Sequence, residues 1–354
     1  MSEHKAAISN KRGEELKVAT RPTPTPGPGE VLIQVKSVAL NPIDHVQRDT
    51  GFQVAKYPAI FGYDIAGVIA QVGTEVSDFL AVGKRVAAYS FAFDKKGAPD
   101  YGGFQEYTLV PAEVVAPIPE DLTFNEATLL PMAVHTAWAG FYQIGIDEST
   151  LAGFSTSKTP ILVWGASSSI GSNVLQILTR LGFIVYATAS KKNHEYLTSL
   201  AASPESVKLF DYKSPTVVED IISATKANNS PIELGYLAAG DLNTVVKVLN
   251  ATKPTAATAK LAVTPFTFNL LLWKLHTWRG VQATFVAPPT DAAKALEFRK
   301  FVFGQWLKEA LVSKTFTPAP KIKILNGGLE GIQNGLEELK AGVNLTKLVA
   351  EISK

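Results

Sequence analysis

The segment 161–171, ILVWGASSSIG, most strongly constrains how this chain can fold. An apolar stretch leads into a Gly/Ser-rich turn, and the turn opens the helical pattern SNVLQILTRLG. Strand and helix patterns continue to alternate around it. Strands are expected at Ile161–Gly165, Phe183–Ala189, Val207–Asp211, Glu233–Ala239, Lys260–Val263 and Val281–Val286. Such alternation predicts an α/β fold built on a doubly wound parallel sheet.

The first third of the chain carries a different pattern. After the proline-rich segment Arg21–Gly29, residues 30–40 alternate apolar and polar side chains as a half-buried strand does. Short strand patterns separated by Gly and Pro follow, and similar patterns return after Phe316. We therefore expect a β-rich domain from residues 1–125 with 312–354. The doubly wound domain is expected over 126–311 and to end in a long helix, Ala292–Leu311.

Composition narrows the function classes. The 354 residues are 46% hydrophobic, and the net charge of +2 comes without a block of like charges that would attract nucleic acid. No uninterrupted apolar run approaches the ~20 residues of a membrane span. The chain has no cysteine, and its five histidines share no short metal-ligand spacing. We expect a cytoplasmic protein that uses no metal, binds no nucleic acid and does not enter a membrane.

The turn after the first of these strands is the expected phosphate-binding site. Gly165 and Gly171 stand where the backbone must approach a ligand closely, and the start of the following helix directs N–H groups at an anion. The serine hydroxyls of the turn can add phosphate contacts. Glycine also occurs in such turns for chain geometry alone, but the strand–turn–helix context favours a dinucleotide. The expected cofactor-binding residues of the turn are Gly165, Ala166, Ser167, Ser168, Ser169, Ile170 and Gly171.

The end of the second strand indicates which nicotinamide cofactor is bound. An NAD site normally carries Asp or Glu about 20 residues beyond the glycine turn, where the acid accepts hydrogen bonds from the ribose. Here the strand ends in Ser190 and Lys191, which attract a 2′-phosphate, and Tyr212 closes the next strand. An ordinary solvent-exposed basic turn is the alternative. The missing carboxylate favours NADPH.

Motifs along nearly the whole chain resemble those of one enzyme family. GEVLIQV, FGYDIAGVIAQVGTEV, GGFQEYTLVP, LPMAVHTAW, ILVWGASSSIG and GGLEGIQNGLEELKAGVNLTKLV follow one another in register. The ordered series resembles the medium-chain dehydrogenases/reductases, in particular the zinc-free quinone-oxidoreductase branch with the fungal ToxD-like, trans-acting enoyl reductases. The resemblance implies a GroES-like substrate domain, a Rossmann domain and a cleft between them.

The resemblance also addresses zinc. Zinc-dependent relatives place Cys, His and Cys at three positions of the cleft, and the matching positions here are Asn41, Tyr63 and Met132. None of these is a good zinc ligand. The region that corresponds to a structural zinc lobe has no cysteine either. Alcohol oxidation is therefore disfavoured, whereas reduction of an activated C=C bond needs only cofactor positioning and an enolate stabiliser.

Four residues are candidates for the chemistry. By resemblance Asn41 faces the cleft and can donate to a substrate carbonyl, against the alternative of a turn-forming Asn-Pro. Tyr63 is a candidate proton donor, against a buried structural tyrosine. His45 is a weaker donor candidate, and protonation by water alone stays open. The resemblance places Thr136 beside the nicotinamide, against a threonine that bonds back to the previous helical turn.

The leading hypothesis is an NADPH-dependent reductase of enones or enoyl thioesters. A quinone or carbonyl reductase is the alternative among enzymes. A noncatalytic NADPH-binding protein is the alternative of another class, because Val46 and Phe52 replace tyrosines that related reductases often carry. The expected partner is a small apolar acceptor, and the segment Phe266–Trp278 is expected to line its pocket, to form a subunit contact or to be a core helix. The resemblance further implies a homodimer and a polyketide synthase partner.

Overall fold

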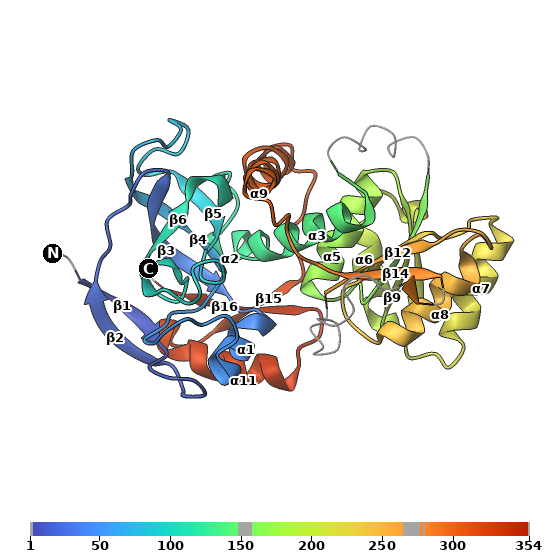
Figure 1. Cartoon of the computed structure of the whole chain (residues 1–354), viewed down its shortest axis with the longest axis horizontal. Helices are drawn as coiled ribbons and strands as arrows, with labels where there is room; N and C mark the ends of the chain where they lie inside the picture. The colour runs from blue at the N-terminus through green and yellow to red at the C-terminus, as the bar shows by residue number, and fades with distance from the viewer. Residues whose placement is uncertain (1–2, 148–157, 265–276, 279, 353–354) are drawn as a thin grey trace. The chain divides into compact units, whose positions relative to one another are not determined.

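The computed structural model describes residues 3–147, 158–264, 277–278 and 280–352, which group into two compact units (Figure 1). The first unit comprises Met1–Met132 with Leu296–Lys354, and the second comprises Ala133–Ala295. The chain therefore leaves the first unit and returns to it. Each unit has its own sheet and is described by itself.

The second unit is built on a seven-stranded sheet whose order is β10-β9-β8-β11-β12-β14-β13. All neighbouring strands are parallel except β13 and β14. Its first six strands have the order of a doubly wound dinucleotide-binding fold, in which the chain reverses direction beside the central first strand, here β8. The strands are β8 (Pro160–Trp164), β9 (Ile184–Ala189), β10 (Val207–Asp211), β11 (Leu234–Leu237), β12 (Ala259–Val263), β13 (Thr277–Trp278) and β14 (Val281–Phe285). The predicted α/β class and parallel sheet are confirmed.

Several helices pack against this sheet through an apolar face. In α5, for example, Val174, Leu175, Ile177 and Leu178 are fully buried, and the helix contacts β8 and β9. The helical segments are α3 (Pro131–Ile144), α5 (Ser169–Arg180), η3 (Lys191–Asn193), α6 (His194–Leu200), η4 (Pro204–Ser206), α7 (Val217–Ala227), α8 (Leu242–Thr252) and α9 (Ala292–Arg299). The first turn of α3 belongs to the first unit, as does the end of α9.

The first unit is β-rich. Its main sheet has the order β15-β16-β3-β4-β5-β7, and β6 pairs with β3 beside this path. Neighbours are antiparallel except β15 and β16, which are parallel and bring the end of the chain against β3. The strands are β3 (Glu30–Ala39), β4 (Asp64–Val72), β5 (Arg85–Tyr89), β6 (Tyr107–Pro111), β7 (Val115–Pro117), β15 (Lys321–Leu325) and β16 (Thr346–Glu351).

Short helices complete this unit and close its edges. They are α1 (Pro42–Thr50), η1 (Pro99–Tyr101), η2 (Ala112–Val114), α2 (Phe124–Ala127), η6 (Lys300–Leu307), α10 (Lys308–Val312), η7 (Gly328–Gly331) and α11 (Ile332–Ala341). Helix α1 packs on α11, so an early and a late segment of the sequence share one face.

The unit boundaries differ from the predicted ones. Residues 126–132 and 296–311, which the sequence patterns place in the doubly wound domain, group with the β-rich unit. The predicted helix Ala292–Leu311 is continuous but passes through a π-helical segment, η6. This segment packs on η2 and β7, and Arg299 forms an ion pair with Glu113 at 3.3 Å. These contacts bind the second half of the helix to the first unit.

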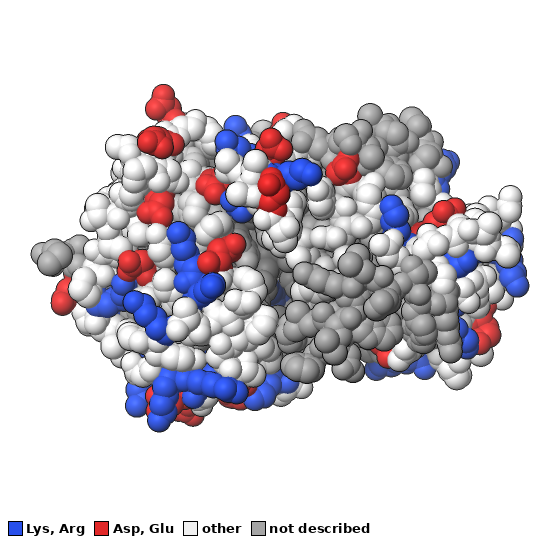
Figure 2. Space-filling model, viewed as in Figure 1, with Lys and Arg blue, Asp and Glu red and all other residues white. Residues whose placement is uncertain are grey.

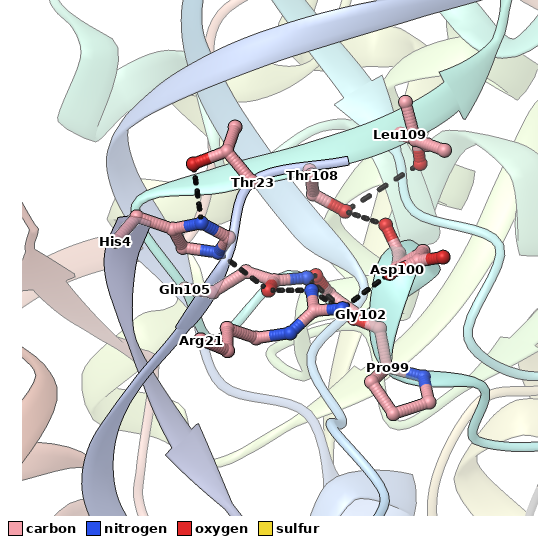
Figure 3. Close-up of polar contacts among 9 residues, drawn as sticks. All are labelled: His4, Arg21, Thr23, Pro99, Asp100, Gly102, Gln105, Thr108 and Leu109. Carbon is pink, nitrogen blue, oxygen red and sulfur yellow. Dashed lines mark hydrogen bonds and ion pairs between the residues drawn. The ribbon is translucent and has the colours of Figure 1, made fainter. Parts of the chain in front are cut away.

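A two-stranded sheet at the start of the chain, β1 (Glu3–Ile8) with β2 (Lys17–Pro22), is tied to η1 by a buried polar cluster (Figure 3). His4 contacts Thr23 through Nδ1 and Gln105 through Nε2, both at 3.0 Å. Arg21 donates to the same Gln105 oxygen at 2.9 Å and pairs with Asp100. Gln105 in turn donates to the carbonyls of Pro99 and Gly102. Because the Gln105 oxygen can only accept, Nε2 of His4 carries a proton.

Charge on the surface is mixed. On the face drawn in Figure 2, acidic and basic side chains are interspersed with uncharged surface. Among the described helices, none is long and apolar enough to cross a bilayer.

Candidate cofactor-binding and active site

Two glycines allow the turn after β8 to fold tightly. Gly165 has a φ of +84°, and a Cβ atom there would stand 2.6 Å from the carbonyl oxygen of Ala239. At Gly171 a Cβ atom would stand 2.2 Å from the carbonyl oxygen of Gly165. Real Cβ atoms do not approach that closely, so a side chain at Gly165 would push the turn away from the segment after β11, and one at Gly171 would push α5 away from the turn. The position of α5 over the end of β8 depends on both glycines.

The Ser168 hydroxyl forms its hydrogen bonds within the turn itself. It is the N-cap of α5, and its hydroxyl accepts from the Gly171 N–H at 3.0 Å while donating to the Gly165 carbonyl at 2.9 Å. The N-terminal position of a helix favours such an acceptor because the first N–H groups lack intrahelical partners. Of the predicted phosphate-contacting serines, Ser168 therefore has a structural duty.

The next residues leave donors available. Among the described residues, the buried hydroxyl of Ser169 has no hydrogen-bond partner. No backbone acceptor within the described chain is recorded for the N–H groups of Ser169 and Ile170. These groups lie in the first turn of α5, where the helix dipole favours negative charge. Ala166 is fully buried and Ser167 is partly exposed beside them. The turn therefore offers donors to an anion.

The ends of β9 and β10 form a second polar site. In the parallel register Ala189 pairs with Asp211, so Ser190 and Tyr212 are the first residues beyond two adjacent strand ends. The Ser190 hydroxyl is buried and has no partner among the described residues. Lys191 follows in η3 and is exposed, and Tyr212 is 45% exposed. A hydroxyl, an ammonium and a phenol are thus presented together without an adjoining carboxylate on β9.

These two groups of residues fit a phosphorylated dinucleotide. A buried hydroxyl without a partner costs about 1–3 kcal/mol, so Ser169 and Ser190 are costly unless a ligand bonds to them. The first lies at the helix start and the second at the carboxyl end of the adjacent strand β9, which is where dinucleotides bind in this topology. The positions of the Ser169 and Ser190 hydroxyls therefore fit a bound dinucleotide.

In the first unit Asn41 belongs to a closed network. Its Nδ2 donates to Asp64 Oδ2 at 2.8 Å and reaches the Ala39 carbonyl at only 3.4 Å, while its Oδ1 accepts from Lys347 Nζ at 2.6 Å. Lys347 Nζ lies 2.8 Å from Asp64 Oδ2. All three side chains are at most 5% exposed. Asn41 is therefore a member of a buried ionic network and stands directly before Pro42, the first residue of α1.

Asp44 anchors the same region. Its carboxylate accepts from the Asn41 N–H at 2.7 Å and from the Gly62 N–H at 3.2 Å. The first bond caps α1, and the second fixes the loop before β4. Burial raises the pKa of Asp44 to about 8, although both N–H donors and nearby Lys347 favour the ionised form. These bonds give Asp44 a structural role.

Tyr63 is fully buried, and its hydroxyl donates to Gln47 Oε1. Its ring stacks on Tyr89 with centroids 5.8 Å apart. Burial raises the pKa of Tyr63 well above its ordinary value of 10.0, which opposes loss of its proton. The geometry is that of a satisfied structural tyrosine, the alternative weighed against the proton donor.

The other two candidates remain partly exposed. His45 lies on α1, and burial lowers its pKa, so it is neutral near pH 7. Thr136 lies on α3, where its carbonyl accepts from the Tyr236 hydroxyl at 2.8 Å. Among the described residues no bond from the Thr136 hydroxyl to the previous helical turn is recorded. Thr136 and the glycine turn belong to the second unit, and Asn41, His45 and Tyr63 to the first.

Sequence reasoning missed three buried polar residues of the first unit: Asp64, Lys347 and Gln47. The run FGYDIAGVIA carried a signal for Asp64, because a lone carboxylate within an apolar strand needs a partner. The sequence carries no such signal for Lys347, since a lysine in an alternating strand is normally exposed. Most of the segment Phe266–Trp278 lies outside the described residues.

Within the described ranges no cluster of side chains supports metal binding. No group of three or more His, Cys, Asp or Glu side chains there is arranged to hold an ion. Met132, at a position where zinc-dependent relatives carry a ligand, instead donates its backbone N–H to Asp64 Oδ1 at 2.6 Å.

The chain is similar to known proteins in sequence and in fold. Residues 27–120 match the alcohol dehydrogenase GroES-like domain. The chain is 39% identical over 353 residues to the trans-enoyl reductase tndF of Aspergillus flavipes, covering 99% of both chains. It is 42% identical over 295 residues to the trans-enoyl reductase tazE of Aspergillus terreus, covering 82% of this chain and 94% of the relative. The quinone oxidoreductase from Coxiella burnetii shares the fold, with a TM-score of 0.71 at 20% identity over 99% of this chain and 100% of that one.

Proposed function

The chain belongs to the medium-chain dehydrogenase/reductase family and is an oxidoreductase that uses a nicotinamide cofactor, and from this premise we propose an NADPH-dependent reductase of activated C=C bonds. The acceptor class is an enone or enoyl thioester. The names of the two trans-enoyl reductases, which align over most of this chain, support it. The observation that carries the choice of cofactor is the buried Ser190 hydroxyl, which lies beside Lys191 and has no partner among the residues that the structure describes.

The phosphorylated cofactor is favoured over the unphosphorylated one by charge. A 2′-phosphate accepts hydrogen bonds that the Ser190 hydroxyl otherwise lacks, and the Lys191 ammonium offsets its charge. A ribose without that phosphate satisfies fewer of these groups. Tyr212 adds a phenol hydroxyl from the neighbouring strand end.

The chain's own residues bind and orient in this proposal. Bound NADPH supplies the hydride. The first turn of α5 and the Ser169 hydroxyl hold the diphosphate, and Thr136 contacts the nicotinamide through its open hydroxyl. Asn41 donates to the acceptor's carbonyl oxygen, whose charge grows during reduction. Because Tyr63 is satisfied by Gln47, the enolate takes its proton from water or from His45.

A substrate panel tests the proposal. NADPH oxidation is followed with enones and enoyl thioesters, then with quinones, then with aldehydes. Turnover of the first group at least about tenfold faster than of the others, a barrier difference of about 1.4 kcal/mol, supports an enoyl reductase. Preference for quinones or aldehydes would replace that substrate class. NADPH binding without any turnover would favour the noncatalytic alternative. A homodimer, a polyketide synthase partner and a cytoplasmic location stay predictions.

A further inference from the structure

Lys347 occupies an unusual place for a lysine. It lies on β16 with 4% of its surface exposed, and its ammonium contacts Asn41 Oδ1 and Asp64 Oδ2. Burying an ammonium and a carboxylate costs several kcal/mol per ion before their attraction is counted. A plain apolar pair at these positions would avoid that cost. This cost indicates that the network has a role other than stability.

The ammonium decides how the Asn41 amide is oriented. An ammonium has only donors, so the amide must turn its oxygen toward Lys347 and its nitrogen away. The nitrogen then meets Asp64 Oδ2 at 2.8 Å. Asp64 is itself fixed, since its other oxygen accepts from the Met132 N–H at 2.6 Å. Both ends of the amide are held by charged groups that cannot exchange roles.

This orientation leaves one N–H of Asn41 loosely engaged. The Nδ2 group has two hydrogens, and its second contact, to the Ala39 carbonyl, is 3.4 Å long. Such a length is at the weak end of hydrogen bonds. The Asn41 backbone cannot drift to improve it, because the Asp44 carboxylate holds the Asn41 N–H at 2.7 Å.

We propose that Lys347 is a positioning residue for the reduction: it locks the Asn41 amide so that its loosely held N–H is presented to the carbonyl oxygen of the acceptor. The inference rests on the proposed function and deepens it by naming what orients the donor. Without Lys347 the amide oxygen loses its donor and only Asp64 still holds the amide, so the direction of the loosely held N–H is no longer fixed. Asp64 would also lose its cationic partner.

A double-mutant cycle on turnover tests this. Lys347→Met and Asn41→Ala are each expected to lower kcat about a hundredfold, the loss associated with a misplaced or missing donor. The double variant should lose no more than either single variant, because Lys347 acts through Asn41. Lys323→Met, which removes an exposed lysine on the neighbouring strand β15, is the matched control and should keep wild-type kcat.

The readouts separate positioning from general damage. The Kd for NADPH of Lys347→Met should stay within about twofold of wild type, since the change concerns the acceptor. If Met at this position prevents folding, Lys347→Gln, which keeps a neutral donor, replaces it in the cycle. Losses that multiply to about ten-thousandfold in the double variant, or an equal loss of NADPH binding, would overturn the inference. An inert wild-type enzyme would instead overturn the proposed function, and the inference would fall with it.

Discussion

Within the described part of the second unit the buried hydroxyls of Ser169 and Ser190 have no partners, whereas in the first unit Asn41, Asp64 and Lys347 bond to one another. Both regions are polar and buried, but one is open to a ligand and the other is largely closed on itself. An unpartnered buried hydroxyl costs about 1–3 kcal/mol, which a bound phosphate can recover. In a closed network the hydrogen bonds instead fix the positions of the side chains.

We infer from this difference that the polar groups of the second unit bind the cofactor and that those of the first unit orient the acceptor. Among the described residues the donors at the start of α5 and beyond β9 lack partners, and this is why we propose that the cofactor binds there. The closed network leaves one weak contact, from Asn41 to Ala39, and so it points to a single oriented donor. Substitutions in the second unit should therefore weaken NADPH binding, whereas substitutions in the first unit should change stability or turnover.

Gly171→Ala should have the largest effect. Its Cβ would stand 2.2 Å from the Gly165 carbonyl, and the turn would have to move away from α5. We expect the Kd for NADPH to rise at least about a hundredfold, because the donors of the turn lose their common direction. Fluorescence titration measures the Kd, and circular dichroism checks the fold. Gly304→Ala, where a Cβ meets no atom within 4 Å, is the control. Unchanged NADPH affinity in Gly171→Ala would remove the turn from the cofactor site.

Tyr63→Phe should affect stability rather than turnover. Removing the hydroxyl leaves the Gln47 oxygen without the donor it now has, at a cost of about 1–2 kcal/mol in the free energy of unfolding. We expect kcat to change less than about twofold, because the hydroxyl is occupied inside the unit. Urea unfolding and steady-state kinetics measure the two effects, with Tyr142→Phe on the exposed side of α3 as the control. A tenfold fall in kcat with unchanged stability would return Tyr63 to the chemistry.

His4 should produce a smaller, pH-dependent effect. Burial lowers the pKa of His4 below its ordinary value of 6.5, with Arg21 acting in the same direction and Gln105 against it (Figure 3). The unfolded chain therefore binds a proton at higher pH than the folded protein does. Stability is fully present above pH 6.5 and decreases as the pH falls from there through the folded-state pKa. Urea unfolding at several pH values should show this loss, and His4→Asn should reduce the slope. Stability that increases on acidification through this range would contradict the neutral, buried histidine.

Much of the second unit could be predicted because its signals are local. The strand predicted at Val207–Asp211 is β10 residue for residue, and the glycine turn follows from Gly165 and Gly171 within the strand–turn–helix pattern. Which serine caps the helix was not visible. Ser167, Ser168 and Ser169 are adjacent and chemically alike, and only the fold assigns the cap to Ser168.

The closed network could not be predicted because its members are distant in sequence. Asn41 and Lys347 are separated by 306 positions, and strand pairing of β16 with β3 brings their segments together. A lysine in the alternating run KLVAEIS has the pattern of an exposed side chain. The division between the units was misplaced for a related reason, since the packing of η6 on η2 and β7 has no local signature.

Cofactor preference tests the central claim most directly. Steady-state kcat/KM is measured with NADPH and with NADH for the wild type, Ser190→Ala and Lys191→Ala, with Lys226→Ala on α7 as the control. The open hydroxyl and the ammonium predict a wild-type preference for NADPH of about a hundredfold, which each of the two variants reduces about tenfold by weakening NADPH alone. Equal use of the two cofactors, or a preference for NADH, would contradict the assignment of Ser190 and Lys191 to a phosphate.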